Sequence, residues 1–389
     1  MNTRRRVVYL DNHATTQVDP RVIAAMLPYF SEIYGNAASR QHEYGWRAEA
    51  AVERARKQVA DLVGGSPEEV VFTSGATESI NLALRGIAGA AAGRHMVTVV
   101  TEHRAVLDTI TTLERGGLEA TLLPVDRFGR VDPDDVRKSL RPGTVLVSIM
   151  AANNEIGTLA PLREIGELCR ERGILFHSDA TQAVGRIPVR MRETGVDLLS
   201  MSAHKLHGPK GVGALVIRSG KPLIDLTAQI TGGGHEKGIR SGTLNVPAIV
   251  GFGVAAELAL QEGIAGQPAI ALRRDRLVGM LQERLDDTTV NGHPTLRLAN
   301  NASVTFEHAK ADAVMMAMKD VAVSAGSACS SALPEPSHVL QAIGVSREAA
   351  ASTLRFGLSM FTTDEEIAFA AERVAEAVQG VRSRVYTAV

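Results

Sequence analysis

Residues 174–179 read ILFHSD, and this stretch decides the fold. It starts apolar and ends on a carboxylate, Asp179, which is typical of a short buried strand that ends at a polar sheet edge. A second stretch, VDLLSMSAHK at residues 196–205, repeats the pattern and ends on Lys205. The two stretches predict consecutive strands that carry an acid and an amine at or just beyond their ends.

The same pattern extends back along the chain to residue 66. Continuous apolar strands separated by helices indicate a mostly parallel sheet that is buried on both faces. In such sheets the functional side chains lie at the carboxyl ends of the strands. The predicted strands cover residues 70–72, 95–100, 118–124, 145–150, 174–178 and 196–201, and the predicted helices cover 78–85, 105–115, 132–140 and 161–172.

Beyond Pro247 the pattern changes, and we expect a second, smaller α+β domain. A final helix should begin at the capping box formed by Thr363 and Glu366. The other elements predicted there are helices at 248–261, 271–285 and 311–319, and strands at 302–306 and 353–356.

Composition narrows the classes of function. The chain has 389 residues, 45% of them hydrophobic, and a net charge of −1. A balanced charge gives no reason to expect direct binding to nucleic acid or to an anionic membrane surface, and no apolar run reaches the roughly eighteen residues of a spanning helix. The two cysteines, Cys169 and Cys329, favour a reducing cytoplasm over a disulfide framework, and they do not resemble a metal site.

Three polar features have both a chemical and a structural interpretation. The segment from Thr73 to Thr77 opens a helix, which favours a phosphate there, although an ordinary N-cap explains it equally well. Asp179 suits the protonated ring nitrogen of pyridoxal phosphate (PLP); the alternative is a helix N-cap. Lys205 suits a Schiff base with a carbonyl cofactor; the alternative is a solvated lysine in a turn. The order of Asp179 and Lys205 on consecutive strand ends favours the cofactor.

Two further candidate residues lie next to or within predicted strands. His103 follows a predicted strand and could lie over a flat cofactor or act as a general base; a histidine bonded to the backbone is the alternative. Arg355 lies in an extended segment between Leu354 and Phe356, where it could bind a substrate carboxylate through two hydrogen bonds. Its alternative is a structural ion pair.

The two cysteines differ in their surroundings. Cys329 lies among small residues in SAGSACSS at 324–331 and just before a proline-rich turn, which suits a mobile loop that carries a nucleophile. Cys169 lies within a predicted helix and is expected to be a buried, inert thiol.

Four motifs in the same order resemble those of the cysteine desulfurases, which are fold type I PLP enzymes of the class V aminotransferase group. The resemblance runs from Tyr9 to Thr363, and the motifs are HSDATQ at 177–182, SAHK at 202–205, GSAC at 326–329 and LRF at 354–356. It implies a large domain (15–262) with a mostly parallel seven-stranded sheet flanked by helices. It also implies a smaller α+β domain built from residues 1–14 and 263–389.

The resemblance implies roles for the cofactor-binding residues. Lys205 would form the Schiff base, Asp179 would partner the pyridine nitrogen, Gln182 would donate to the ring oxygen, and His103 would stack on the ring and transfer protons. The phosphate would be held by Ala76, Thr77, Ser202 and His204, and by Thr243 of a second subunit. A homodimer follows from that last role.

The resemblance also implies the reaction. Asn154 and Arg355 would bind the carboxylate of L-cysteine, and Cys329 would take its sulfur as a persulfide and leave L-alanine. The sulfur-acceptor protein stays open among iron–sulfur assembly, tRNA thiolation and DNA phosphorothioation. Alternatives are a selenocysteine lyase, an aminotransferase, or a non-catalytic scaffold. His13 stands where the family varies and is assigned no role.

Overall fold

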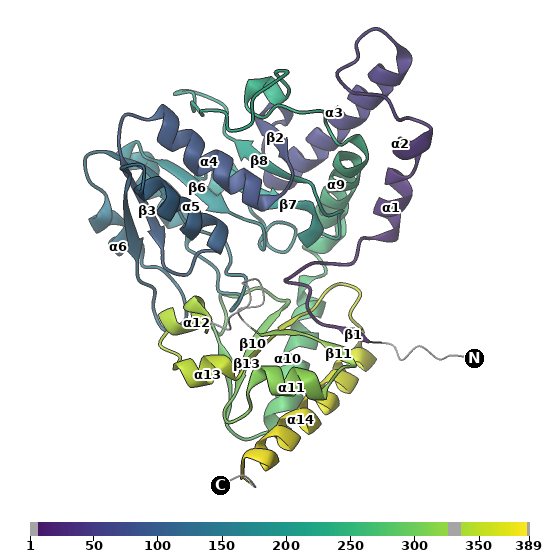
Figure 1. The fold of residues 1–389 in the computed structure, drawn as a ribbon, viewed down its shortest axis with the longest axis vertical. Coiled ribbons are helices and arrows are strands. Elements are labelled where there is room, and N and C mark those ends of the chain that lie inside the picture. Colours follow the sequence, from purple (N-terminus) through teal and green to yellow (C-terminus); the bar gives the residue numbers. More distant parts are fainter. Residues whose placement is uncertain (1–6, 326–335, 387–389) are drawn as a thin grey trace.

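The computed structural model describes residues 7–325 and 336–386, so Cys329 and its predicted loop lie outside the described residues. Figure 1 shows a larger α/β layer above and a smaller α+β layer below, with the first strand of the chain beside the smaller layer. Buried apolar side chains form two clusters on the large sheet and a separate cluster in the smaller layer.

The large sheet has seven strands, of which six run in the same direction and confirm the predicted mostly parallel arrangement. β8, which the sequence pattern did not single out, runs antiparallel between β2 and β7. The order across the sheet is β2 (Val70–Thr73), β8 (Gly213–Ile217), β7 (Leu198–Ser202), β6 (Leu175–Asp179), β5 (Thr144–Ser148), β3 (His95–Val99) and β4 (Glu119–Leu123).

Both faces of this sheet are buried, because successive side chains of a strand point to opposite faces. Leu198 belongs to the cluster on one face, and Leu199 belongs to the cluster on the other. The first face packs against α4 (Ala76–Ala90) and α5 (Arg104–Glu114). The second packs against α3 (Glu43–Val63), α7 (Leu162–Arg172) and α9 (Val246–Leu258). The sheet therefore leaves its strand ends as the place for polar side chains.

Local signals account for several helix ends. α1 (Pro20–Met26) begins with Asp19 as its N-cap, and α3 ends at Gly64, whose φ of 66° is left-handed. The predicted capping box is confirmed: Thr363 Oγ1 accepts from the Glu366 N–H at 3.2 Å, and Glu366 Oε2 accepts from the Thr363 N–H at 3.1 Å. It starts α14 (Asp364–Tyr386).

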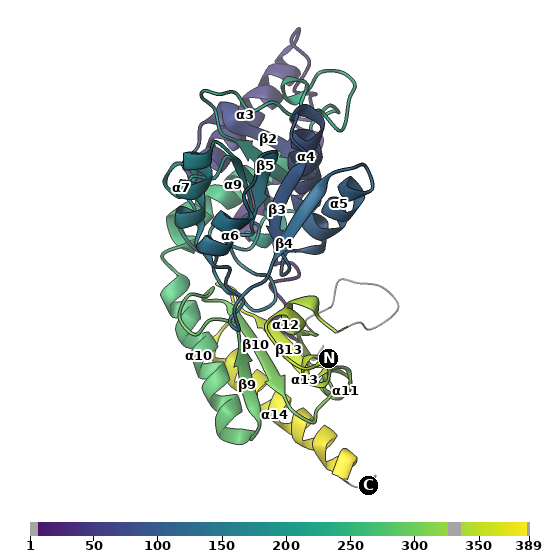
Figure 2. The same cartoon turned by 90° about the vertical axis from the view of Figure 1, so that its left-hand side faces the viewer.

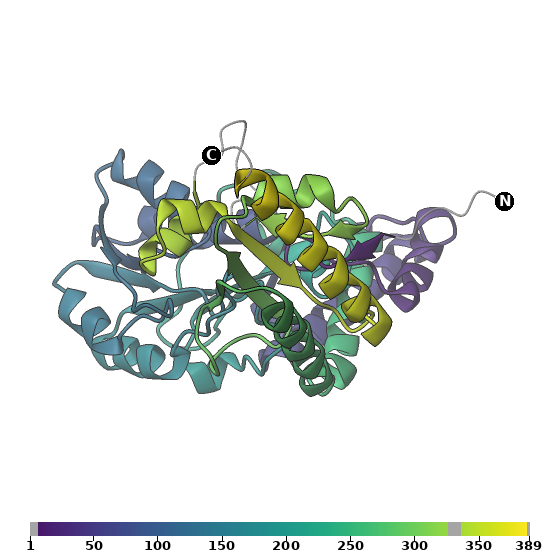
Figure 3. The same cartoon turned by 90° about the horizontal axis from the view of Figure 1, so that it is seen from below.

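The smaller layer is a four-stranded antiparallel sheet packed against helices. Its strands, in order, are β12 (Ser324–Ala325), β13 (Thr353–Gly357), β10 (Asn301–Phe306) and β9 (Thr288–Asn291). The same core contains side chains of α10 (Gln267–Arg284), α11 (Ala311–Ala317) and α14. Figure 3 shows yellow α14 in front of these strands, and Figure 2 shows α10 beside them.

The N-terminal segment joins this smaller layer. β1 (Val8–Tyr9) pairs in parallel with β11 (Val321–Ala322), and Val8 and Leu10 lie in the small-domain core. The chain then crosses to the large domain, where the Thr16 N–H donates to the carbonyl of His204 at 3.0 Å. Residues 11–16 therefore lie between the two layers.

Within residues 7–325 and 336–386 no single helix meets the length and hydropathy of a span; only Val246–Gly263 together with Gln267–Arg284 does so, and this pair is bent by 76°.

Candidate active site

A cavity of about 610 Å³ opens at the strand ends of the large sheet, between the two layers. It is lined by every predicted site residue except Thr243 and Cys329: Ala76, Thr77, His103, Asn154, Asp179, Gln182, Ser202, His204, Lys205 and Arg355. His13, Ala14 and Thr15 of the crossing segment also line it, together with Lys210. Residues separated by almost the whole chain thus converge on one site.

The start of α4 forms one end of the cavity and fits a phosphate group. In the part of the chain that the structure describes, no side chain caps this helix, whose first residue is Ala76. A Cβ added to Gly213 would lie 2.6 Å from the Cα of Gly75, so the strand and the turn touch through glycine. Exposed N–H groups at a helix start favour an anion, and the cavity adds Ser202, His204 and Lys210 around it.

His204 is neutral in this setting. Burial is the main cause that lowers its pKa to about 4, with Lys205 and Lys210 adding to the effect. Its Nδ1 lies 3.2 Å from Thr15 Oγ1. A phosphate placed between this ring and Lys210 would supply the negative charge that the surroundings of His204 lack.

Asp179 ends β6 and is 6% exposed. Its Oδ1 accepts from the Thr181 N–H at 2.9 Å in a turn, so the helix N-cap interpretation does not hold in this structure. Glu102 lies nearby and is fully buried; burial first, and the charge of Asp179 second, hold the pKa of Glu102 well above its ordinary value. A neutral Glu102 adds no charge of its own beside the Asp179 carboxyl.

His103 is the N-cap of α5. Its Nδ1 accepts from the Ala105 N–H at 3.1 Å, so in the neutral ring the proton is on Nε2. The backbone contact and the cavity position therefore coexist, and the ring is held with its protonated nitrogen away from the helix.

Lys205 lies in the 3₁₀ turn Ala203–Lys205, directly after β7. Its Nζ donates to the carbonyl of Ala14 at 2.7 Å and also to the carbonyl of His13. Its own carbonyl accepts from Nη2 of the buried Arg186 at 2.9 Å. The amine is thus held at the cavity wall rather than in solvent.

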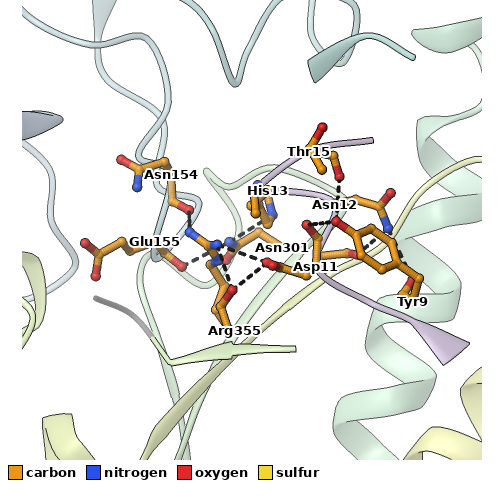
Figure 4. Close-up of polar contacts among 12 residues, drawn as sticks. Tyr9, Asp11, Asn12, His13, Thr15, Asn154, Glu155, Asn301 and Arg355 are labelled. Carbon is orange, nitrogen blue, oxygen red and sulfur yellow. Dashed lines mark hydrogen bonds and ion pairs between the residues drawn. The ribbon is translucent and has the colours of Figure 1, made fainter. Parts of the chain in front are cut away.

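Arg355 projects from β13 into the interface between the layers (Figure 4). Its Nη2 pairs with Asp11 Oδ1 at 3.1 Å, and its Nη1 donates to the carbonyl of Asn154 at 2.9 Å. Its buried Nε has no hydrogen-bond partner among the described residues. The ion pair given as the alternative is present, and Arg355 also lines the cavity.

The remaining predicted residues fall elsewhere. Thr243 is exposed and does not line the cavity of its own chain. Cys169 is 1% exposed, which confirms the predicted buried cysteine, and burial raises the pKa of its thiol to about 12.

The sequence pattern missed Asp11 and His13 as members of the site. Asp11 pairs with Arg355, and the His13 ring lies between Gln182 and Asn301. Both residues stand in a polar loop after the first strand, and that is the one local signal they carry.

Comparisons with known proteins agree with this geometry. The family model described as aminotransferase class V matches residues 8–369. A cysteine desulfurase IscS of Anaeromyxobacter dehalogenans (strain 2CP-C) is 54% identical over 377 residues, which are 96% of this chain and 93% of that protein. A solved structure titled NifS-like protein has a TM-score of 0.89 at 37% identity and covers 96% of this chain and 99% of its own. Another, titled SspA in complex with cysteine, has a TM-score of 0.81 at 35% identity and covers 91% and 99%.

The fold and the site define a class V aminotransferase-type enzyme, and the chain belongs to that family, whose members use PLP. Within the family it is a cysteine desulfurase, which confirms the resemblance found in the sequence motifs.

Proposed function

We propose that this chain binds PLP in the 610 Å³ cavity and takes sulfur from L-cysteine onto Cys329. The observation that carries the proposal is the convergence of Lys205, Asp179 and the open start of α4 on one cavity. An amine, an acid for the ring nitrogen and an anion site are the three groups that PLP requires. When bound, PLP acts as an electron sink for the substrate.

The residues of the chain then have defined tasks. Asp179 would hold the proton of the ring nitrogen, and His103 would stack on the ring and transfer protons. Lys205 binds the cofactor and moves the α-proton of the substrate. Gln182 donates to the ring oxygen, and Ala76, Thr77, Ser202 and His204 hold the phosphate.

Arg355 and Asn154 orient the substrate. Both residues line the cavity, and Arg355 Nη1 donates to the Asn154 carbonyl at 2.9 Å, so a guanidinium suited to a carboxylate lies at the cavity wall. The similar protein solved in complex with cysteine supports L-cysteine as the ligand.

Sulfur transfer is the task of Cys329, which lies outside the described residues. Its thiolate attacks the sulfur of the substrate, the carbon–sulfur bond breaks, and the electron pair stays with the substrate carbon, which takes up a proton to give L-alanine. The sulfur remains on Cys329 as a persulfide, and an acceptor protein later takes it. Relatives named IscS favour iron–sulfur assembly as the pathway served.

A homodimer would complete the phosphate site. Thr243 is exposed, and it stands three positions after Arg240, whose Nε pairs at 2.7 Å with Glu78 of the cavity wall. The segment that carries Thr243 is therefore next to the cavity rim, where it could reach the site of a second copy.

The test is single-turnover conversion of L-cysteine by the PLP-loaded chain without reductant. We expect one L-alanine and one protein persulfide per site. Cys329→Ala should keep the cofactor absorbance and form no persulfide, whereas Cys169→Ala should match the unmodified chain. Persulfide formation by Cys329→Ala would refute the role of Cys329, and a chain that forms no alanine would refute the proposal.

A further inference from the structure

A directed series of hydrogen bonds links the small domain to Gln182 through His13. It begins at Arg297, whose Nη2 donates to Asn301 Oδ1 at 3.2 Å. A guanidinium has donors only, so the atom that faces it is the amide oxygen. The orientation of the Asn301 amide is therefore determined.

Asn301 in turn determines the tautomer of His13. Both hydrogens of its Nδ2 are used, one toward the Glu155 carbonyl at 3.0 Å and one toward His13 Nε2 at 3.1 Å. Figure 4 shows Asn301 between these two partners. Since Nε2 receives a hydrogen bond, it carries no proton.

The His13 ring is neutral, so its proton is on Nδ1. The residue is 1% exposed, and burial holds its pKa well below the ordinary value, with the positive charges of Arg355, Arg186 and Lys205 acting in the same direction. Nδ1 donates to Gln182 Oε1 at 3.0 Å, and Gln182 Nε2 donates to the His13 carbonyl at 3.0 Å. One N–H of Gln182 is left for the cavity that this residue lines.

We propose that His13 is a positioning residue that holds the Gln182 amide with its N–H₂ group, not its oxygen, available to the cofactor. The inference deepens the proposed function and rests on it, because the acceptor is the negatively charged ring oxygen of PLP. A reversed amide would place its oxygen against that charge and leave a buried donor and acceptor mismatched at His13. The role assigned to Gln182 thus depends on His13, and Asn301 of the smaller layer determines which ring nitrogen of His13 carries the proton.

The test uses the PLP-loaded full chain and compares His13→Phe with a matched control, His95→Phe. His95 is also a buried histidine with both ring nitrogens bonded, to Thr144 at 2.8 Å and Thr121 at 2.9 Å, but it does not line the cavity. His13→Phe should raise the PLP dissociation constant by about tenfold, as expected for one charge-assisted hydrogen bond, and should move the pH midpoint of the cofactor absorbance upward. His95→Phe should lower the melting temperature and change neither quantity.

Two further measurements keep the outcome decisive. Combining His13→Phe with Gln182→Leu should shift the midpoint no further than Gln182→Leu alone, because both changes remove the same contact. In the unmodified chain, imidazole ¹⁵N chemical shifts should show His13 protonated at Nδ1 and bare at Nε2, which needs no variant to fold. The opposite tautomer, an unchanged midpoint in His13→Phe, or additive shifts would overturn the inference and leave PLP binding intact. An unmodified chain that acquires no cofactor absorbance would overturn the proposed function as well.

Discussion

Arg355 of the small-domain strand β13 and Asp11 of the crossing segment form an ion pair, with Nη2 and Oδ1 separated by 3.1 Å. Ser324 Oγ donates to the same carboxylate oxygen at 2.7 Å. The pair fixes the guanidinium at the cavity wall, so the residue that would bind substrate is positioned before substrate arrives.

Replacing Arg355 should separate binding from folding. Arg355→Lys keeps the charge but loses the planar fork, so we expect the KM for L-cysteine to rise at least about tenfold while the PLP absorbance is retained. Asp11→Asn is the companion variant. It keeps the shape of the side chain but removes the charge partner of a buried guanidinium, and it should lower the free energy of unfolding by about 2 kcal/mol or more. Steady-state kinetics and urea unfolding measure the two effects, and an unchanged KM in Arg355→Lys would contradict the substrate role.

Glu155 should make stability depend on pH. Burial is the main cause that raises the pKa of its carboxyl to about 7, although Ser337, Arg355 and Arg104 act against it. Between about pH 4.5 and 7 the folded chain therefore binds more protons at this site than the unfolded chain. The contribution of Glu155 to the free energy of unfolding is complete below the pKa of the unfolded chain. It is lost as the pH rises through 7, and the loss amounts to up to about 3 kcal/mol.

Glu155→Gln should remove that part of the slope. Urea unfolding of the cofactor-free chain at several pH values would measure it, with Glu114→Gln as the control, since Glu114 is exposed at the end of α5. An equal slope in Glu155→Gln and the unmodified chain would show that Glu155 is ionised in both states.

Gly213 and Gly279 should respond in opposite ways to alanine. The added Cβ of Gly213→Ala would meet the Gly75 Cα at 2.6 Å and push the turn before α4 out of place. We expect a loss of about 2 kcal/mol in unfolding free energy and weaker binding of PLP. Gly279 lies inside α10 with nothing within 4 Å of its added Cβ, so Gly279→Ala should stabilise the chain by about 0.5–1 kcal/mol. Equal PLP affinity in Gly213→Ala and Gly279→Ala would argue against the phosphate position at α4.

Strand ends were the part of the site that sequence could predict. The runs that end near Asp179 and Lys205 start with apolar residues and end on polar ones, so the sequence pattern places these side chains at one sheet edge. β8 was not predicted because it comes directly after the glycines and the proline of residues 208–213, which are typical of a turn and obscure where a strand begins. Its antiparallel direction depends on its pairing with β2 and β7, which local sequence does not reveal.

The role of His13 could not be predicted from the sequence. Its ring partners, Gln182 and Asn301, lie 169 and 288 positions away, and no local pattern carries information over such separations. The Arg355–Asp11 pair spans 344 positions and could not be predicted for the same reason. Tertiary structure, not residue type, decides what these side chains do.

The pairing of β1 with β11 has a consequence for how the protein is made. Val8 aligns with Val321, so β1 is synthesised more than three hundred residues before its partner strand. At a synthesis rate of about 5–20 residues per second the wait is on the order of tens of seconds. During that time the large sheet, whose last strand ends at Ile217, can form completely, while Val8 and Leu10 have no core to enter. The small domain is therefore the last part of the chain to close, and the crossing segment with His13 and Asp11 takes its final place only at that step.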